Sequence, residues 1–271
     1  MSSVTSRPGG SGMRYRPSND EPADGRLGRF VPDDFDHVSA YPLTALTADE
    51  RPTRSPVVLG VNWYAEFDEP EEDRRSGEFF VARQGASSLT TIRGGHSVCL
   101  EPGGEPDTEE LWDFYDQGSE GACVGFGWSR CMTMLNDGTR YTARWLWDRA
   151  KEQDEWPQTK PGDNDGTSVR AAAGVLRTSG HVRWREGHAD DDHVERGEYD
   201  PRRPAGIRRF RWARSVADVH AVLGNERGDE LGAVCFLNSW GRDYPHRTWM
   251  PDDVLDRLLR EDGEIAVPTD R

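Results

Sequence analysis

The stretch YDQGSEGACVGFGWSRCMTML, residues 115–135, joins a glycine-rich loop to an apolar segment, and Cys123 stands at the junction. The apolar segment predicts a buried helix that begins near Cys123. The unpaired N–H groups at the N-terminus of this helix would stabilise a negative sulfur and lower the thiol pKa of Cys123. Gly121 and Ala122 leave space for a substrate backbone, and the side-chain amide of Gln117 can donate to an oxyanion. The stretch therefore indicates a thiol suited to acyl transfer, with an inert packing thiol as the alternative.

The sequence on both sides of this stretch contains strand and helix patterns. Two runs of β-branched, aliphatic and aromatic residues before it, at residues 55–67 and 91–102, are predicted as strands. After it, the patterns predict helices over residues 142–153, 165–180, 215–224 and 251–263 and a strand over residues 232–241. Thr167 or Ser168 is expected to cap the second of these helices, and Gly180 to end it. This mixture predicts an α+β fold.

Composition excludes several classes of partner. The 271 residues carry a formal net charge of -15, and the sequence pI is about 4.9. Because phosphate binding depends on clustered Lys and Arg, we expect neither nucleic acid nor a membrane as a partner. No apolar run approaches the roughly 20 residues of a membrane span, and the first residues contain no apolar region of a signal peptide. We therefore expect a cytoplasmic protein, whose oligomeric state the sequence leaves open.

Cysteine usage agrees with a reducing compartment. The four cysteines have no C-x-x-C spacing and are too few for a disulfide scaffold in a chain of this length. We expect reduced thiols, no metal site and no cofactor, with packing roles for Cys99, Cys131 and Cys235. The acidic tract at residues 187–204 contains two histidines, but we interpret it as a surface loop and not as a cation site.

The chain is expected to divide into a tail and a single domain. Residues 1–28 are rich in Ser, Gly, Pro and charged side chains and lack hydrophobic periodicity, so we expect a disordered tail. Residues 29–271 are expected to form one catalytic domain. No internal repeat divides this region further.

Three segments carry a family resemblance. Residues 116–127, DQGSEGACVGFG, resemble the nucleophile segment of papain-like cysteine peptidases, in which a glutamine lies six positions before the cysteine. Residues 237–241, LNSWG, resemble the segment in which an asparagine orients the catalytic imidazole. Residues 165–182 look like the segment that lines the non-primed side of the cleft. The resemblance implies a papain-like fold, with a helical lobe packed against a β-barrel-like lobe and the active-site cleft between them.

The histidine departs from the family pattern. In the family it follows the cysteine and opens a strand, whereas His220, which has this order, lies in a predicted helix. His96 follows two glycines at the start of a predicted strand, as in the family, but precedes Cys123. We favour His96 as the base, which implies that residues 56–100 have moved ahead of the nucleophile segment, and we retain His220 as the alternative.

Two smaller departures lie around the nucleophile. Glu120 stands where extracellular members of the family have a disulfide cysteine, and Val124 stands where they have an aromatic residue. The missing disulfide cysteine agrees with a reducing compartment.

The resemblance also implies site residues and an activity. The implied catalytic set is a nucleophile, a base, an orienting amide and an oxyanion donor, namely Cys123, His96, Asn238 and Gln117. The implied substrate-binding residues are Gly121, Gly166, Thr167 and Trp240. The implied reaction is thiol-dependent hydrolysis of a peptide or isopeptide bond in a polypeptide or peptide-like substrate, through a thioester. The alternatives are a catalytically degenerate papain-fold binding or virion-associated protein, and a cell-wall amidase that uses the same cysteine and histidine.

Overall fold

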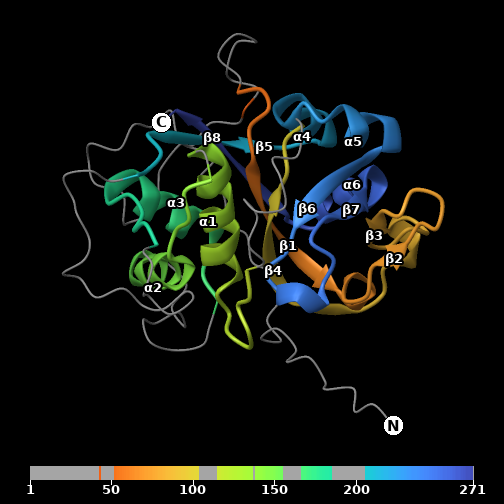
Figure 1. Ribbon diagram of the computed structural model, residues 1–271, viewed down its shortest axis with the longest axis horizontal. Coiled ribbons are helices and arrows are strands. Elements are labelled where there is room, and N and C mark those ends of the chain that lie inside the picture. Colours follow the sequence, from red (N-terminus) through yellow and green to blue (C-terminus); the bar gives the residue numbers. More distant parts are fainter. Residues whose placement is uncertain are drawn as a thin grey trace.

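The structure is a computed structural model that describes residues 43, 52–103, 115–136, 138–154, 166–184 and 205–270. The expected N-terminal tail and the acidic tract lie outside the described residues. Figure 1 shows α1, α2 and α3 grouped on one side of the described part and most of the strands on the other.

The described residues form an α+β fold, as the sequence predicts. The helices are α1 (Cys123–Leu135), α2 (Ala143–Gln153), α3 (Val169–Thr178), α4 (Val216–Leu223), α5 (Glu226–Leu231) and α6 (Asp252–Arg260). The strands are β1 (Val57–Tyr64), β2 (Glu71–Glu72), β3 (Phe79–Phe80), β4 (Ile92–Leu100), β5 (Arg209–Ala213), β6 (Ala233–Leu237), β7 (Thr248–Pro251) and β8 (Glu264–Asp270). They pair in one sheet in the order β2-β3-β7-β6-β4-β1-β8-β5, in which only the β3–β7 pair is parallel.

The sheet has hydrophobic cores on both faces, and β1 lies near its middle. Val58 packs in the core that α1 and α3 help to form, whereas Val57 and Leu59 pack in the core that includes residues of α4 and α6. Because both faces of β1 are covered, its apolar residues form a continuous run and do not alternate with polar ones. Helices thus cover both faces of the sheet at β1.

Glycines let α1 approach its neighbours closely. A Cβ atom on Gly127 would lie 3.1 Å from the Ser97 hydroxyl of β4, a contact tighter than most side chains tolerate. A Cβ on Gly125 would collide with the carbonyl oxygen of Ala143 and lie 2.9 Å from Trp147 Cβ, both on α2. The first turns of α1 are therefore fixed against both β4 and α2.

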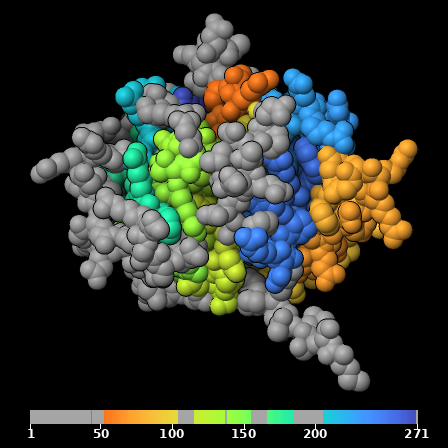
Figure 2. Space-filling model, in the orientation of Figure 1, coloured from red at the N-terminus to blue at the C-terminus, as the bar shows by residue number. Residues whose placement is uncertain are grey.

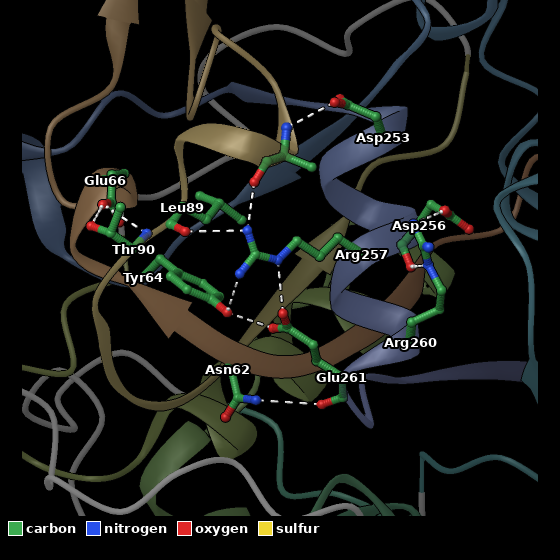
Figure 3. A network of polar contacts seen from close by, with 11 residues as sticks. Asn62, Tyr64, Glu66, Leu89, Thr90, Asp253, Asp256, Arg257, Arg260 and Glu261 are labelled. Carbon is green, nitrogen blue, oxygen red and sulfur yellow. Dashed lines mark hydrogen bonds and ion pairs between the residues drawn. The ribbon is translucent and has the colours of Figure 1, made fainter.

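A polar network on α6 holds the segment that leads into β4 (Figure 3). Arg257 Nη1 donates to the carbonyl oxygens of Ala86 at 2.6 Å and Leu89 at 3.2 Å. Arg257 Nε donates to Glu261 at 2.7 Å, and the Tyr64 hydroxyl donates to the same carboxylate at 2.6 Å. One guanidinium therefore ties together α6, the end of β1 and the entry to β4.

Candidate active site

Cys123 is the first residue of α1, where the sequence places the helix start. The residue is buried, with 7% of its surface exposed. Burial raises the pKa of the Cys123 thiol to about 11, although backbone hydrogen bonds from Ser97, Val124 and Cys123 itself favour the thiolate. The predicted low thiol pKa is therefore wrong for this structure, because desolvation outweighs the helix N-terminus. The backbone contact with Ser97 places the sulfur beside β4.

His96 lies on β4 and contacts Asn238, the residue that follows β6. His96 Nε2 lies 2.7 Å from Asn238 Oδ1, and the Ser239 backbone N–H donates to the same oxygen at 2.8 Å. An oxygen only accepts, so Nε2 carries the proton, and a neutral imidazole has a single N–H. Nδ1 therefore holds the lone pair that a general base needs. Burial lowers the pKa of His96 to about 4, against the opposing effect of the Asn238 bond, so the ring is neutral at pH 7.

Sheet pairing explains how residues 142 positions apart in the sequence come together. β4 and β6 are antiparallel neighbours, with Cys99 opposite Leu237 and Leu100 opposite Phe236. The end of β6 therefore delivers Asn238 to the part of β4 that carries His96. In Figure 2 the yellow-green of α1 and the blue of the C-terminal strands lie on the same face of the molecule.

Two indole rings flank the imidazole of His96. The Trp63 ring lies edge-on at a centroid distance of 4.5 Å, and the Trp240 ring lies at 5.1 Å with a tilt of 44°. Trp63 Nε1 donates to Asp68 at 3.0 Å, which fixes the orientation of the indole. The sequence predicted Trp240 near the site but not Trp63, since the contact of Trp63 depends on the register that places it opposite Gly94.

Gln117 connects the loop before α1 (residues 115–122), the predicted nucleophile loop, to the segment after Asn238. Its backbone N–H donates to the Ser239 carbonyl at 2.9 Å, and the Ser239 hydroxyl donates to Gln117 Oε1 at 2.6 Å. Gln117 Nε2 donates to the Glu120 carbonyl at 2.8 Å, and a primary amide has a second N–H beyond this bond. The structure thus brings Gln117 next to the segment that carries Asn238.

The expected substrate-binding segments also lie side by side. A Cβ atom on Gly166 would lie 3.7 Å from the carbonyl oxygen of Gly121. Thr167 is buried, and its hydroxyl donates to Asp154 at 2.6 Å, so this hydroxyl is occupied. Ser168, and not Thr167, caps α3, since its side chain accepts from the Ala171 N–H.

His220 lies elsewhere in the fold. Its Nδ1 lies 2.7 Å from Asp229 of α5 and its Nε2 lies 2.8 Å from Asp252 of α6. Both ring nitrogens are thus occupied by carboxylates, and the side chain ties α4 to two neighbouring helices. The structure therefore brings His96, and not His220, to Asn238.

The described residues contain no cluster of three or more His, Cys, Asp or Glu side chains that could hold a metal ion. In the same part of the chain, no helix has the length and apolar character needed to span a membrane. All four cysteines are buried free thiols.

Comparison with known proteins finds partial structural likeness. The sequence matches no family model and no curated protein. Xylellain, a cysteine protease from Xylella fastidiosa, is 13% identical over 82% of this chain and 98% of its own, with a TM-score of 0.47. Procathepsin L 3 from the larval midgut of Tenebrio molitor is 12% identical over 62% and 73% of the two chains, with a TM-score of 0.43. A chain from a structure concerning the mite allergens Blo t 1 and Der p 1 is 13% identical over 59% and 67%, with a TM-score of 0.42.

Proposed function

We propose that this chain is a thiol-dependent peptidase in which Cys123, His96 and Asn238 act together in the manner of papain-like cysteine peptidases. The observation that carries the proposal is the contact between His96 Nε2 and Asn238 Oδ1. This contact leaves the lone pair of the imidazole on Nδ1. The sulfur of Cys123 contacts the backbone of Ser97, the next residue along the same strand.

In the proposed reaction, His96 Nδ1 accepts the thiol proton as the sulfur of Cys123 attacks the carbonyl carbon of an amide or isopeptide. The C=O π electrons move to oxygen, and this oxyanion accepts hydrogen bonds from the Gln117 amide and the backbone N–H of Cys123. Collapse of the intermediate breaks the C–N bond, and the amine leaves with the proton from His96. Water then hydrolyses the thioester with His96 again acting as base.

The remaining features fit a peptide-like substrate. The backbones of Gly121 and Gly166 lie next to each other, and the absence of side chains leaves room for the backbone of an extended substrate to pair with them. The Trp240 ring and the Trp63 ring of β1 both pack against the imidazole of His96. The proposal includes the relocation of the block from β1 to β4 ahead of the segment that carries Cys123. It also includes a cytoplasmic location, which the four free thiols favour.

Fluorogenic peptide and isopeptide libraries, together with cell-wall fragments, test the proposal. We expect hydrolysis by the wild type, an acyl-enzyme detected by mass spectrometry, and a loss of at least about 1000-fold in Cys123→Ala. Cys131→Ala is the matched control, because Cys131 is a second buried cysteine of α1, and it should retain activity. Hydrolysis of cell-wall fragments alone would instead identify an amidase.

A second pair of variants tests the choice of histidine. His96→Ala should lower the acylation rate by orders of magnitude while the protein stays folded. His220→Ala should retain acylation and lose about 1 kcal/mol of stability, because it breaks the tie between α4, α5 and α6. An active His96→Ala together with an inactive, folded His220→Ala would overturn the assignment.

A catalytically degenerate binding protein of the same fold is the second candidate, and the burial of both reacting groups favours it. The pKa of the Cys123 thiol is raised to about 11 and that of His96 is lowered to about 4, which are unfavourable values for forming charge in the absence of substrate. A wild-type protein that forms no acyl-enzyme with any substrate in the libraries would support this candidate.

A further inference from the structure

We infer that Glu120 and Arg144 form a positioning pair that holds the side-chain amide of Gln117 in the orientation needed at the proposed site. This inference rests on the proposed function, because Gln117 is the proposed donor to the oxyanion. Neither Glu120 nor Arg144 is proposed to touch the substrate.

Glu120 contacts both Arg144 and Gln117. Its carboxylate forms an ion pair with Arg144 Nε. Its carbonyl oxygen accepts from Gln117 Nε2 at 2.8 Å, and its backbone N–H donates to the Gln117 carbonyl at 3.3 Å. The position of the Gln117 nitrogen therefore depends on where the Glu120 backbone lies, and the Glu120 side chain fixes that backbone to α2.

Arg144 is a rigid anchor because of where it lies on α2. It is the second residue of the helix, next to Ala143, whose carbonyl faces Gly125 of α1 too closely to admit a Cβ atom. The guanidinium carbon lies 5.5 Å from the centroid of the Phe126 ring, and the Arg144 side chain is only 17% exposed. Close helix packing and this cation–π contact hold the guanidinium relative to the first turn of α1.

The oxygen of the Gln117 amide is held by the segment after β6. The Ser239 hydroxyl donates to Gln117 Oε1 at 2.6 Å, so the oxygen is fixed from the segment after β6 while the nitrogen is fixed from Glu120. Two contacts at opposite ends define the orientation of a planar amide. Release of the Glu120 end would let the nitrogen shift, and a displacement of about 1 Å at a reacting group can cost up to about 100-fold in rate.

The loop before α1 has one side-chain contact of its own and no side-chain cap at its end. Gly118 adopts a positive φ of 60°, and its N–H donates to Asp116 Oδ1 at 2.8 Å, but the N-cap of α1, Ala122, has no side chain that could accept a hydrogen bond. An ion pair to a neighbouring helix is therefore well placed to stabilise this loop. Because the Glu120 side chain is 30% exposed, the pair should weaken as salt screens it.

Glu120→Gln tests the inference, since it removes the charge and keeps the size of the side chain. We expect kcat for peptide hydrolysis to fall about tenfold with little change in KM. Affinity for a peptide aldehyde should fall similarly, because the Cys123 sulfur adds to the aldehyde carbon to give a hemithioacetal whose oxygen occupies the proposed oxyanion position. Alkylation of Cys123 by iodoacetamide forms no oxyanion and should stay within about twofold of wild type. Raising the NaCl concentration about tenfold should lower kcat in wild type but not in the variant.

Glu152→Gln is the matched control, because Glu152 forms an ion pair with Arg149 on the same helix at similar exposure. It should leave kcat, aldehyde affinity and alkylation unchanged. Equal kcat and aldehyde affinity in Glu120→Gln and wild type would overturn the inference. A parallel loss of alkylation rate and melting temperature in Glu120→Gln would also overturn it, as a general structural role. A wild type without hydrolytic activity would instead overturn the proposed function.

Discussion

His96 and Cys123 are both buried, and burial shifts the pKa values of the two side chains in opposite directions. It raises the pKa of Cys123 to about 11 and lowers that of His96 to about 4. At neutral pH Cys123 is therefore a thiol and His96 a neutral imidazole. In the proposed reaction, acylation would then begin with proton transfer from sulfur to nitrogen during attack, and not from a preformed ion pair.

The rate at which iodoacetamide alkylates Cys123 should report this resting state. Below the thiol pKa the thiolate fraction rises about tenfold per pH unit, so we expect the rate to increase steadily from about pH 6 to about pH 10. Mass spectrometry of the labelled peptide separates Cys123 from the other cysteines, and Cys123→Ala gives the background. A plateau between about pH 5 and pH 8 would show a thiolate–imidazolium pair and contradict the prediction.

Residues of the site differ in how far the sequence predicts them. Gln117 and Asn238 lie in short local motifs, and the resemblance of these motifs to one family selects them. His96 was predicted at the start of a strand, which is wrong, because β4 begins at Ile92 and His96 lies inside it. Trp63 and Arg144 contact the site only through strand register and helix packing, which no local pattern encodes. The thiol pKa was mispredicted for a related reason, since a helix N-terminus is visible in sequence and the extent of burial is not.

At the scale of elements, segments with a continuous apolar or amphipathic pattern were predicted well, and segments with an interrupted or very short pattern were missed. The predicted helix start at Cys123 is confirmed, and the helix predicted over residues 215–224 is present as α4, with Ser215 as its N-cap. β5 escaped prediction because arginines interrupt its apolar residues, and β8 because Pro268 lies within it. α5 has only six residues and stood in what the sequence suggested was a connecting segment.

Two glycine-to-alanine substitutions separate helix propensity from helix packing. Gly125→Ala should destabilise the protein by about 1–3 kcal/mol, because the new methyl group meets the Ala143 carbonyl and Trp147 of α2. Gly174→Ala on α3 is the control, since its nearest atom would be the end of the Gln153 side chain at 3.5 Å. It should stabilise by about 0.5–1 kcal/mol. Urea denaturation measures both, and equal effects in the two variants would contradict this account of α1–α2 packing.

At the scale of the whole molecule, the α+β class follows from the sequence, but the sheet order does not. Helical and strand periodicities are local, whereas the pairing of β4 with β6 joins segments that are separated by five helices, α1 to α5, and by β5 in the described chain. Only the resemblance of LNSWG and the Gly-Gly-His segment to one family suggested that these strands meet. The relocation of the β1–β4 block remains a prediction.

Buried histidines should make the folded state sensitive to acid. Burial lowers the pKa of His96 to about 4 and that of His181 to about 3, and partial burial together with the charges of Arg130 and Arg247 lowers that of His246 to about 4. An unfolded imidazole titrates near 6.5. The unfolded chain therefore binds more protons from about pH 6.5 down to about pH 4, and the free energy of unfolding falls as the pH falls through this window.

His181 offers the clearest test of this acid sensitivity. Its Nδ1 accepts from the Val182 N–H at 2.9 Å, and its Nε2 lies 2.8 Å from the Ser129 hydroxyl, so the buried ring has no place for a second proton. His181→Gln should reduce the slope of stability against pH by about 1.4 kcal/mol per unit between about pH 6 and pH 5. Urea titrations at several pH values measure the slope, and an unchanged slope would contradict the assignment.

The pairing order of the central strands has a consequence for biosynthesis. β1 and β4 leave the ribosome first and pair with each other, but the partner of the outer edge of β4 is β6 and that of β1 is β8, both from the last part of the described chain. During translation these two edges stay unpaired, and unpaired strand edges can pair with strands of other chains and aggregate. A nascent chain stopped before β6 would contain Cys123 and His96 but neither Asn238 nor the strands that cover these two edges. The arrival of β6 and β8 should therefore end the need for chaperone protection of these edges and, if the chain acts as proposed, should also set the onset of catalysis.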